Sequence, residues 1–279
     1  MSCLVKIRAV REDLSANEKK IADFILQNAA LIRDYSSQNL SATVGVSQSS
    51  IIKFSQKLNY RGFTDLKLAI HEAVVKSETD ERPGESNKAS EPGTGSIPQS
   101  LYNDKNEALL TTMELNDEER MLAAVKVLEE SDRIQIIALG AGSLVARNFA
   151  SNLIQIGKSV IAEVDTYIQL SSIATLGPRD AVFVISYAGQ SPKMVQITRQ
   201  AKKAGTTVIS LTNYNANPVR SLADIRLFCV NHEGRFQVPQ IISSASQQHV
   251  VDVLFSWMLK RDRHARELLA LSRKAVEAI

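Results

Sequence analysis

The sequence has few of the residues that build metal centres or disulfide frameworks. Its two cysteines, Cys3 and Cys229, lie far apart in 279 residues, so no CxxC spacing exists. We expect both to be reduced thiols, as in proteins of a reducing compartment. The four histidines are scattered along the chain and, even with the cysteines, offer no metal-ligand spacing. We therefore expect neither a metal nor a cofactor.

Long apolar runs are also absent. No segment approaches the roughly 18 apolar residues that a membrane-spanning helix needs. The first residues do not form a signal peptide, because charged side chains from Lys6 to Asp13 interrupt the apolar core that a signal peptide requires. These two absences predict a cytoplasmic protein that makes no membrane contact.

The composition is that of a globular protein, with 44% hydrophobic and 23% charged residues. The net charge of +3 is unevenly distributed. Residues 1–77 contain 11 Lys and Arg against 7 Asp and Glu, an excess of +4, whereas the remainder contains 22 against 23. A positive excess at one end suits contact with nucleic-acid phosphates, although +4 alone is weak support.

Residues 40–59, with the sequence LSATVGVSQSSIIKFSQKLN, contain the most informative pattern of the chain. The pattern predicts two helices joined by a tight turn at Gly45, with Ser47 capping the second helix. We expect the small residue Ala42 where the two helices cross. The expected apolar faces consist of Val46, Ile51, Ile52, Phe54 and Leu58. This is the arrangement of a helix-turn-helix, whose second helix enters the major groove of DNA.

The predicted recognition helix supplies the candidate DNA contacts. Residues at the start of such a helix face base edges, whereas cations near its end are better placed for phosphates. The expected DNA-binding residues are Ser47, Gln48, Ser49, Ser50 and Lys53 at the start, and Lys57, Arg61 and Lys67 for phosphates. Ordinary helix surface is an alternative interpretation of Ser49 and Ser50.

The chain divides into three segments by pattern. Residues 1–77 are helical, with a capping box of Ser15 and Glu18 and a later helix capped by Thr64. Residues 78–100 are rich in Pro, Gly, Ser and Glu and nearly free of apolar residues, which predicts a flexible linker. Residues 101–279 form the second domain.

The second domain begins with two helices, after which short apolar runs alternate with helical patterns. The apolar runs cover residues 133–140, 159–164, 180–187, 206–213 and 225–230. Such an alternation predicts a parallel sheet covered by helices on both faces. The expected fold class is α/β, an all-helical helix-turn-helix domain followed by a doubly wound parallel sheet. Two helices near 243–259 and 262–278 end the sequence.

Glycines and hydroxyl residues follow three of the predicted strands. They form the segments LGAGS (139–143), SYAGQSP (186–192) and LTN (211–213). Ligands of a doubly wound sheet bind at the carboxyl ends of its strands. Glycines let backbone N–H groups approach an anion, helix N-termini add positive potential, and hydroxyls donate hydrogen bonds. The set suits a phosphate monoester.

Two other interpretations of these segments remain. The first is that they are ordinary turns between strands and helices. The second is a dinucleotide-binding turn that begins at Gly140. That fingerprint requires Gly or Ala at the position of Val145, whose larger side chain would crowd the helix against the strand.

Two stretches resemble known families. GVSQSSIIKFSQKLNYRGFTDLK resembles the helix-turn-helix signature of the RpiR family of bacterial transcription regulators. ISYAGQS resembles the Ser-x-Ser-Gly-x-Ser/Thr pattern of the sugar isomerase (SIS) domain, and residues from about 133 to 230 are similar to that phosphosugar-binding domain. The resemblance covers nearly the whole chain outside the predicted linker. The first stretch is close to that of members that respond to N-acetylmuramate 6-phosphate.

The resemblance implies a phosphate site built on the glycine turns. Ser143, Ser186, Gly189 and Ser191 would hold the phosphate. The chain departs from the family pattern at Ala188, where the family has a hydroxyl residue; a backbone N–H or Gln190 could replace the missing oxygen. Thr212 is equally compatible with a sugar contact and with the end of a strand. The full expected ligand-binding set is Gly142, Ser143, Ser186, Ala188, Gly189, Gln190, Ser191 and Thr212.

These observations predict a regulator of carbohydrate metabolism. We expect it to bind double-stranded operator DNA as a homodimer or homotetramer and to respond to a sugar-phosphate effector. A phosphosugar isomerase is the alternative, since the same fold serves that reaction, which needs a catalytic base. The candidate bases are Glu163, His232, Glu233 and His249, and no pair of them stands at a spacing that demands catalysis. We therefore expect no catalytic residues.

Overall fold

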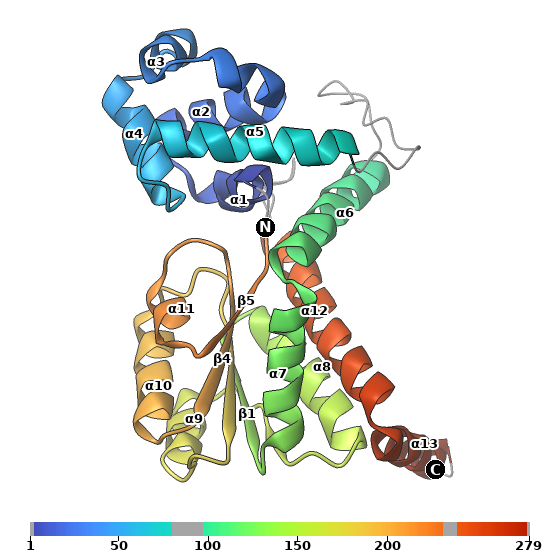
Figure 1. Cartoon of the computed structure of the whole chain (residues 1–279). Helices are drawn as coiled ribbons and strands as arrows, with labels where there is room; N and C mark the ends of the chain where they lie inside the picture. The colour runs from blue at the N-terminus through green and yellow to red at the C-terminus, as the bar shows by residue number, and fades with distance from the viewer. Residues whose placement is uncertain (1–2, 80–96, 231–238, 278–279) are drawn as a thin grey trace. The chain divides into compact units, whose positions relative to one another are not determined.

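The structure is a computed structural model that describes residues 3–79, 97–230 and 239–277 (Figure 1). The chain divides into two compact units, Met1–Asn103 and Asp104–Ile279, and each is considered by itself. None of the helices in the described part of the chain is long and apolar enough to cross a membrane. Cys3 and Cys229 are both buried.

The first unit is helical, as predicted. Its elements are α1 (Cys3–Val10), η1 (Arg11–Asp13), α2 (Ala16–Gln27), η2 (Ala29–Asp34), α3 (Ser37–Val44), α4 (Gln48–Lys57) and α5 (Phe63–Thr79). Each α-helix contributes apolar side chains to the core, among them Ile7, Ile21, Ile25, Leu40, Ile51, Phe54, Leu66 and Ile70. The predicted capping box is confirmed, because the backbone N–H and the hydroxyl of Ser15 both reach Glu18 Oε2 at 2.8 Å.

The predicted helix-turn-helix is confirmed as α3 and α4. Gly45 ends α3 in the left-handed conformation, with φ of 72°, and its N–H donates to the carbonyl of Ser41. A side chain at this position would be strained, so the tight turn requires glycine. Ser47 then begins α4 as its cap, accepting a hydrogen bond from the N–H of Ser50 at 3.2 Å. The two caps fix where one helix ends and the next begins.

Three predicted details of this unit are wrong. Ala42 is exposed, and Ser41 is buried in its place; the Ser41 hydroxyl donates to the carbonyl of Gln38 in the same helix at 2.8 Å, so it has a partner when buried. Ile52 is 39% exposed, since the buried face of α4 is formed by residues on either side of it. Thr64 lies within the first turn of α5 rather than capping it.

Helical residues occupy both ends of the range predicted as a linker. Helix α5 continues to Thr79, and α6 begins at Ile97, so residues 78–79 and 97–100 are helical. Residues 80–96 lie outside the described residues. The domain boundaries at 77 and 100, and the linker itself, stay predictions.

The second unit is the predicted α/β domain. Helix α6 (Ile97–Leu115) crosses the boundary between the two units. The helices that follow it are α7 (Glu118–Glu130), α8 (Gly142–Gln155), α9 (Thr166–Ile173), α10 (Pro192–Lys203), α11 (Pro218–Leu222), α12 (Pro239–Arg261) and α13 (Arg263–Glu277). The strands of the second unit are β1 (Ile134–Ala138), β2 (Val160–Ile161), β3 (Ala181–Ile185), β4 (Thr207–Thr212) and β5 (Ile225–Phe228). Each of the five predicted apolar runs contains one strand.

The five strands form one parallel sheet in the order β2-β1-β3-β4-β5. Helices α7, α8 and α12 cover one face, and α9, α10 and α11 cover the other (Figure 1). The alternation of side chains along each strand divides the core accordingly. On β3, Phe183 and Ile185 pack toward α8 and α12, whereas Val182 and Val184 pack toward α10. This accounts for the unbroken apolar runs of the sequence.

Candidate DNA and ligand sites

The residues expected to contact bases lie together at the start of α4. The hydroxyl of Ser47 is 2.8 Å from the hydroxyls of both Ser49 and Ser50. Gln48 is exposed, and its amide donates to the hydroxyl of Ser37 on α3 at 2.7 Å. These side chains can exchange their local bonds for contacts with base edges, since Ser and Gln both donate and accept.

The cations expected to contact DNA fall into two groups. Lys53 is exposed, and no ion pair joins it to another described residue. Lys57 is paired with Glu18 at 3.0 Å, and Arg61 is paired with Asp65 at 2.6 Å. The contacts of Lys57 and Arg61 with phosphates stay a prediction, and each residue must leave a carboxylate to make them. Ion pairs of this kind at a protein surface contribute only about 0–1 kcal/mol to stability, so a DNA phosphate can take the place of the carboxylate.

The electrostatics of these two pairs follow from the same contacts. Burial raises the pKa of the Glu18 carboxyl, but hydrogen bonds from Ser15 and Lys57 outweigh it and hold that pKa below its ordinary value. The Arg61 guanidinium lowers the pKa of Asp65 by a hydrogen bond and by its charge. Both carboxylates therefore stay ionised at neutral pH. Lys67, also expected on phosphates, donates to the carbonyl of Tyr35 at 3.2 Å.

The strand order brings the two predicted phosphate loops together. From β1 the chain moves outward to β2, and from β3 it moves in the opposite direction to β4. The carboxyl ends of β1 and β3 are therefore the topological switch point, where doubly wound sheets bind ligands. Residues 139–143 follow β1 and residues 186–191 follow β3; we refer to them as the switch-point loops. Ala138 and Ile185, the last residues of the two strands, are direct partners in the sheet.

The first switch-point loop has an exposed turn at Gly140, where φ is 60°, and then begins α8 at Gly142. No side chain caps this helix, so its N-terminal positive potential is not met by a protein oxygen from a cap. The hydroxyl of Ser143 donates to the carbonyl of Gly140 at 2.7 Å. Binding of a phosphate by Ser143 therefore requires its hydroxyl hydrogen to turn away from that carbonyl.

The second switch-point loop has a similar form. Ser191 precedes Pro192 at the start of α10, and its hydroxyl does not cap the helix. Ser186 and Ser191 are half-buried, whereas Ala188 and Gln190 are exposed. Pro at the first helical position needs no partner for an N–H. Two uncapped helix N-termini thus lie at the carboxyl ends of neighbouring strands, as the glycine and hydroxyl pattern indicates.

Asn217, which was not predicted from the sequence, holds the second loop in place. Its Oδ1 caps α11 by accepting from the N–H of Arg220 at 2.8 Å, and its amide nitrogen donates to Thr212 Oγ1 at 3.2 Å. An atom added as Cβ on Gly189 would lie 2.0 Å from Asn217 Oδ1. The N–H of Val219 also donates to the carbonyl of Gly189 at 3.2 Å. The Asn-Pro pair at the start of α11 was the available signal.

Thr212 has a structural environment. It is fully buried, its hydroxyl donates to the carbonyl of Asn213 at 3.0 Å, and it accepts from Asn217. Both functions of the hydroxyl are used within the protein. Of the two interpretations left open for Thr212, these contacts favour the end of a strand.

Gln247 also lies at the switch point, from a distant part of the sequence. It is on α12, it is 3% exposed, and its Oε1 is 3.7 Å from the place where a Cβ on Gly142 would be. The same place is 3.6 Å from Ala138 and from Ile185. The signal for Gln247 was a polar residue on the apolar side of a predicted helix, three positions before Val250.

Two of the four candidate isomerase bases lie within the described residues, in separate segments. Glu163 is exposed beyond β2, and His249 is half-buried on α12, where its Nε2 has no hydrogen-bond partner. His232 and Glu233 lie outside the described residues. Within the ranges that the structure describes, no three His, Cys, Asp or Glu side chains are placed to hold a metal ion.

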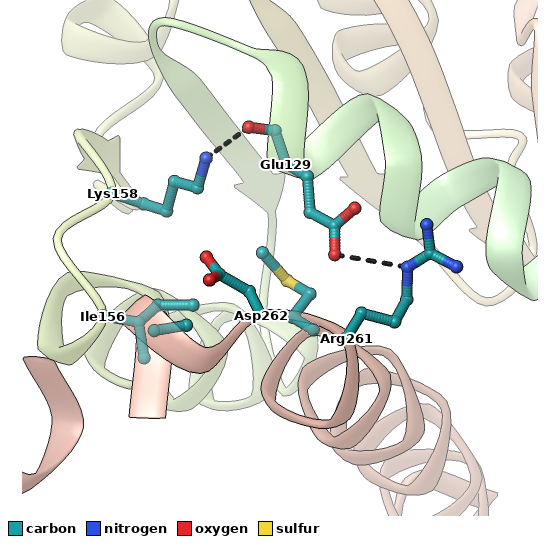
Figure 2. A pocket seen from close by; sticks show the side chains of 7 residues that line it. Glu129, Ile156, Lys158, Arg261 and Asp262 are labelled. Carbon is teal, nitrogen blue, oxygen red and sulfur yellow. Dashed lines mark hydrogen bonds and ion pairs between the residues drawn. The ribbon is translucent and has the colours of Figure 1, made fainter. Parts of the chain in front are cut away.

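A separate cavity of about 280 Å³ lies away from the switch point (Figure 2). Lys158, which lines it, precedes β2, so the cavity is at the amino edge of the sheet. Two contacts join residues of its lining: Arg261 is 3.6 Å from Glu129, and Lys158 donates to the backbone carbonyl of Glu129. These contacts connect α7 to the end of α12 and to the segment before β2.

Comparison with known proteins supports both units. Residues 1–77 match the family described as "Helix-turn-helix domain, rpiR family", and residues 127–256 match the SIS domain. The Vibrio vulnificus NanR protein, solved in complex with ManNAc-6P, is 25% identical; the alignment covers 99% of this chain and 98% of that one, with a TM-score of 0.62.

Two further solved structures share the fold of the second unit. The sugar isomerase domain of an RpiR transcription factor from Sphaerobacter thermophilus is 21% identical over 66% of this chain and 100% of that one, with a TM-score of 0.58. A phosphoheptose isomerase from Francisella tularensis is 16% identical over 60% of this chain and 100% of that one, with a TM-score of 0.50. At these identities the likeness concerns the fold alone.

Proposed function

Because this chain, with its RpiR-type helix-turn-helix domain and its SIS domain, belongs to the RpiR family of transcription regulators, we propose that a sugar phosphate bound at the switch-point loops sets its affinity for operator DNA. It is a DNA-binding regulator rather than an enzyme. One observation carries the proposal: the strand order places both hydroxyl-bearing loops at the switch point. We place the protein in the cytoplasm, where bacterial operators are found.

The phosphate is held by neutral donors. Neither switch-point loop contains Lys or Arg, so backbone N–H groups, the hydroxyls of Ser143, Ser186 and Ser191, and the two helix N-termini supply the attraction. Gly189 lets the backbone approach the anion, and the exposed Gln190 replaces the oxygen that Ala188 lacks. Lys193, exposed in the first turn of α10, adds a positive charge nearby.

The ligand class follows from this chemistry and from the family. A phosphate monoester satisfies several neutral donors at once, and its charge favours a helix N-terminus. N-acetylmannosamine 6-phosphate, which the Vibrio vulnificus NanR structure contains, is the first candidate. N-acetylmuramate 6-phosphate is the second, from the likeness of the helix-turn-helix stretch.

Recognition of DNA rests on α4. Its start, from Ser47 to Ser50, faces base edges together with Lys53, while Lys57 and Arg61 exchange their carboxylate partners for phosphates. A homodimer places two such helices on half-sites about 34 Å apart, the pitch of the duplex. A homotetramer arises from two dimers. Ligand binding changes the separation of the two helices, and the operator affinity changes with it.

The test begins with an operator selected from random DNA by the full chain. Operator affinity is then measured by fluorescence anisotropy with and without each candidate sugar phosphate. We expect one ligand to change the affinity by about 5-fold to 150-fold, the usual range of coupling between two sites. Ser186→Ala and Ser191→Ala should abolish the response and keep the affinity for DNA, whereas Ser151→Ala, an exposed control on α8, should keep both.

Two outcomes would contradict the proposal. Equal operator affinities with every ligand would remove the coupling. Turnover of a sugar phosphate by the purified chain, without DNA, would favour the isomerase instead.

A further inference from the structure

Three glutamines are almost fully buried in the second unit, and one of them differs from the others. Gln135 donates to the carbonyl of Gln169 at 3.0 Å and accepts from the hydroxyl of Ser172 at 2.6 Å. Gln169 donates to the carbonyl of Glu163 at 2.6 Å. Gln247 is 3% exposed, yet no hydrogen bond joins its amide to another described residue. Neither polar atom of Gln247 is among the fully enclosed side-chain atoms without a partner, so its amide reaches solvent although the residue as a whole is almost fully buried. An amide that is open to solvent but bonded to nothing in the described protein calls for an explanation.

The place of Gln247 supplies that explanation. Its amide lies beside Gly142, the first residue of α8, where the ends of β1 and β3 also meet. Helix α8 has no side-chain cap there. Gln248, the next residue on α12, shows the contrast: it donates to Asn148 at 3.0 Å and to Asp252 at 2.7 Å. Of these two neighbouring glutamines, Gln247 is the one whose amide is unused and lies at the switch point.

We propose that Gln247 is a ligand-binding residue that contacts the sugar beside the phosphate. This inference rests on the proposed function. An amide is neutral and has both donors and an acceptor, whereas a phosphate dianion offers acceptors alone. The complementary group is one that both donates and accepts, such as a sugar hydroxyl or an N-acyl group. Gln247 thus distinguishes the sugar, while the two loops hold the phosphate.

A contact of this kind has an unusual consequence for stability. Replacing Gln247 by Met keeps the length of the side chain and removes the unpaired amide. The ligand-free variant should be as stable as the wild type or more stable, because nothing in the protein loses a partner. If Gln247 had a structural role, the ligand-free variant would be less stable than the wild type. A loss of stability is the expected result for Gln135→Met, which removes two hydrogen bonds from a buried site.

The experiment compares Gln247→Met with Gln248→Met in the full chain. The probes are N-acetylmannosamine 6-phosphate, N-acetylmuramate 6-phosphate, N-acetylglucosamine 6-phosphate, glucose 6-phosphate and inorganic phosphate, titrated by calorimetry. For the sugar phosphate that binds the wild type best, we expect Gln247→Met to weaken binding about tenfold, with inorganic phosphate unchanged. Gln248→Met should bind like the wild type.

The outcomes separate the two proposals. If the wild type binds none of the sugar phosphates, the proposed function and this inference both fail. If it binds one, and Ser191→Ala weakens binding while Gln247→Met does not, this inference alone is overturned. A Gln247→Met protein that is less stable without ligand also overturns it, because the amide would then have a partner within the fold.

Discussion

Replacing Gly189 by alanine tests whether the second switch-point loop is held by Asn217. Gly189 has φ of 63°, and an added Cβ would lie 2.0 Å from Asn217 Oδ1 and 2.4 Å from its Cγ. Asn217 cannot move aside freely. It is 4% exposed, it caps α11 through Arg220, and it holds Thr212. The variant must therefore shift the loop or break the cap.

The magnitude follows from a matched control. Gly140 has nearly the same φ, 60°, but no atom lies within 4 Å of its added Cβ. Gly140→Ala should cost about 1–2 kcal/mol of stability, the left-handed strain alone. Gly189→Ala adds overpacking of about 1–3 kcal/mol, giving about 2–5 kcal/mol in all. For a domain of this size, each kcal/mol lowers Tm by about 2–4 °C.

The measurement is thermal unfolding of Gly189→Ala and Gly140→Ala, each alone and combined with Asn217→Ala. It gives the loss of stability that each glycine variant causes with and without Asn217. In the Asn217→Ala background, Gly189→Ala should cost no more than Gly140→Ala, because the atom it collides with is gone. Ligand affinity should fall for Gly189→Ala as the loop shifts. The reasoning would be refuted if the two glycine variants lost the same free energy of unfolding. It would also be refuted if the loss for Gly189→Ala did not decrease in the Asn217→Ala background.

Three further predictions concern other contacts. Ser47→Ala should destabilise the first unit by about 1 kcal/mol through loss of the α4 cap, measured by urea unfolding, whereas the exposed Ser49→Ala should not. Lys53→Ala should reduce the slope of log affinity for operator against log salt by about 1 if it contacts phosphate; an unchanged slope would remove Lys53 from that role. Asp180→Asn should cost about 1–3 kcal/mol at pH 7. Hydrogen bonds from Arg133 and Gly177 lower the pKa of Asp180 in the folded protein. The stability that ionised Asp180 contributes is therefore fully present above pH ~4, the pKa of the group in the unfolded chain, and is lost as the pH falls through the folded pKa. The wild type should therefore lose its advantage over Asp180→Asn in acid, and an advantage that is constant from pH 7 to pH 3 would contradict this.

Local signals in the sequence predicted most of the elements. Ser15 with Glu18 marked a helix start, Gly45 marked a helix end, and five apolar runs marked five strands, because capping and burial act over a few neighbouring residues. The same locality explains the errors. Ala42 and Ser41 are adjacent and both small, and only the angle at which α3 meets its neighbours determines which one is buried.

The glycine and hydroxyl turns after β1 and β3 were predictable for a similar reason, while phosphate binding by them stays a prediction. Glycines and hydroxyls after a strand have a local cause, the turn into a helix. The pairing of Lys57 with Glu18 was not predictable, since 39 positions separate the two residues and the contact depends on how α2 meets α4. Asn217 and Gln247 each carry a local signal, an Asn-Pro pair and a polar residue on an apolar helix face, but packing decides which loop each of them touches.

The sequence by itself determined the two kinds of domain, the helix caps and the loops that suit a phosphate, since these depend on periodicity and on short-range hydrogen bonds. The tertiary structure alone decided which strand ends are neighbours. The order β2-β1-β3-β4-β5 is a property of the assembled sheet, and it places the ends of β1 and β3 side by side although 47 positions separate Ala138 from Ile185. Packing of α12 on α8 places Gln247 beside Gly142, because contacts between distant segments are fixed by the packing of whole faces.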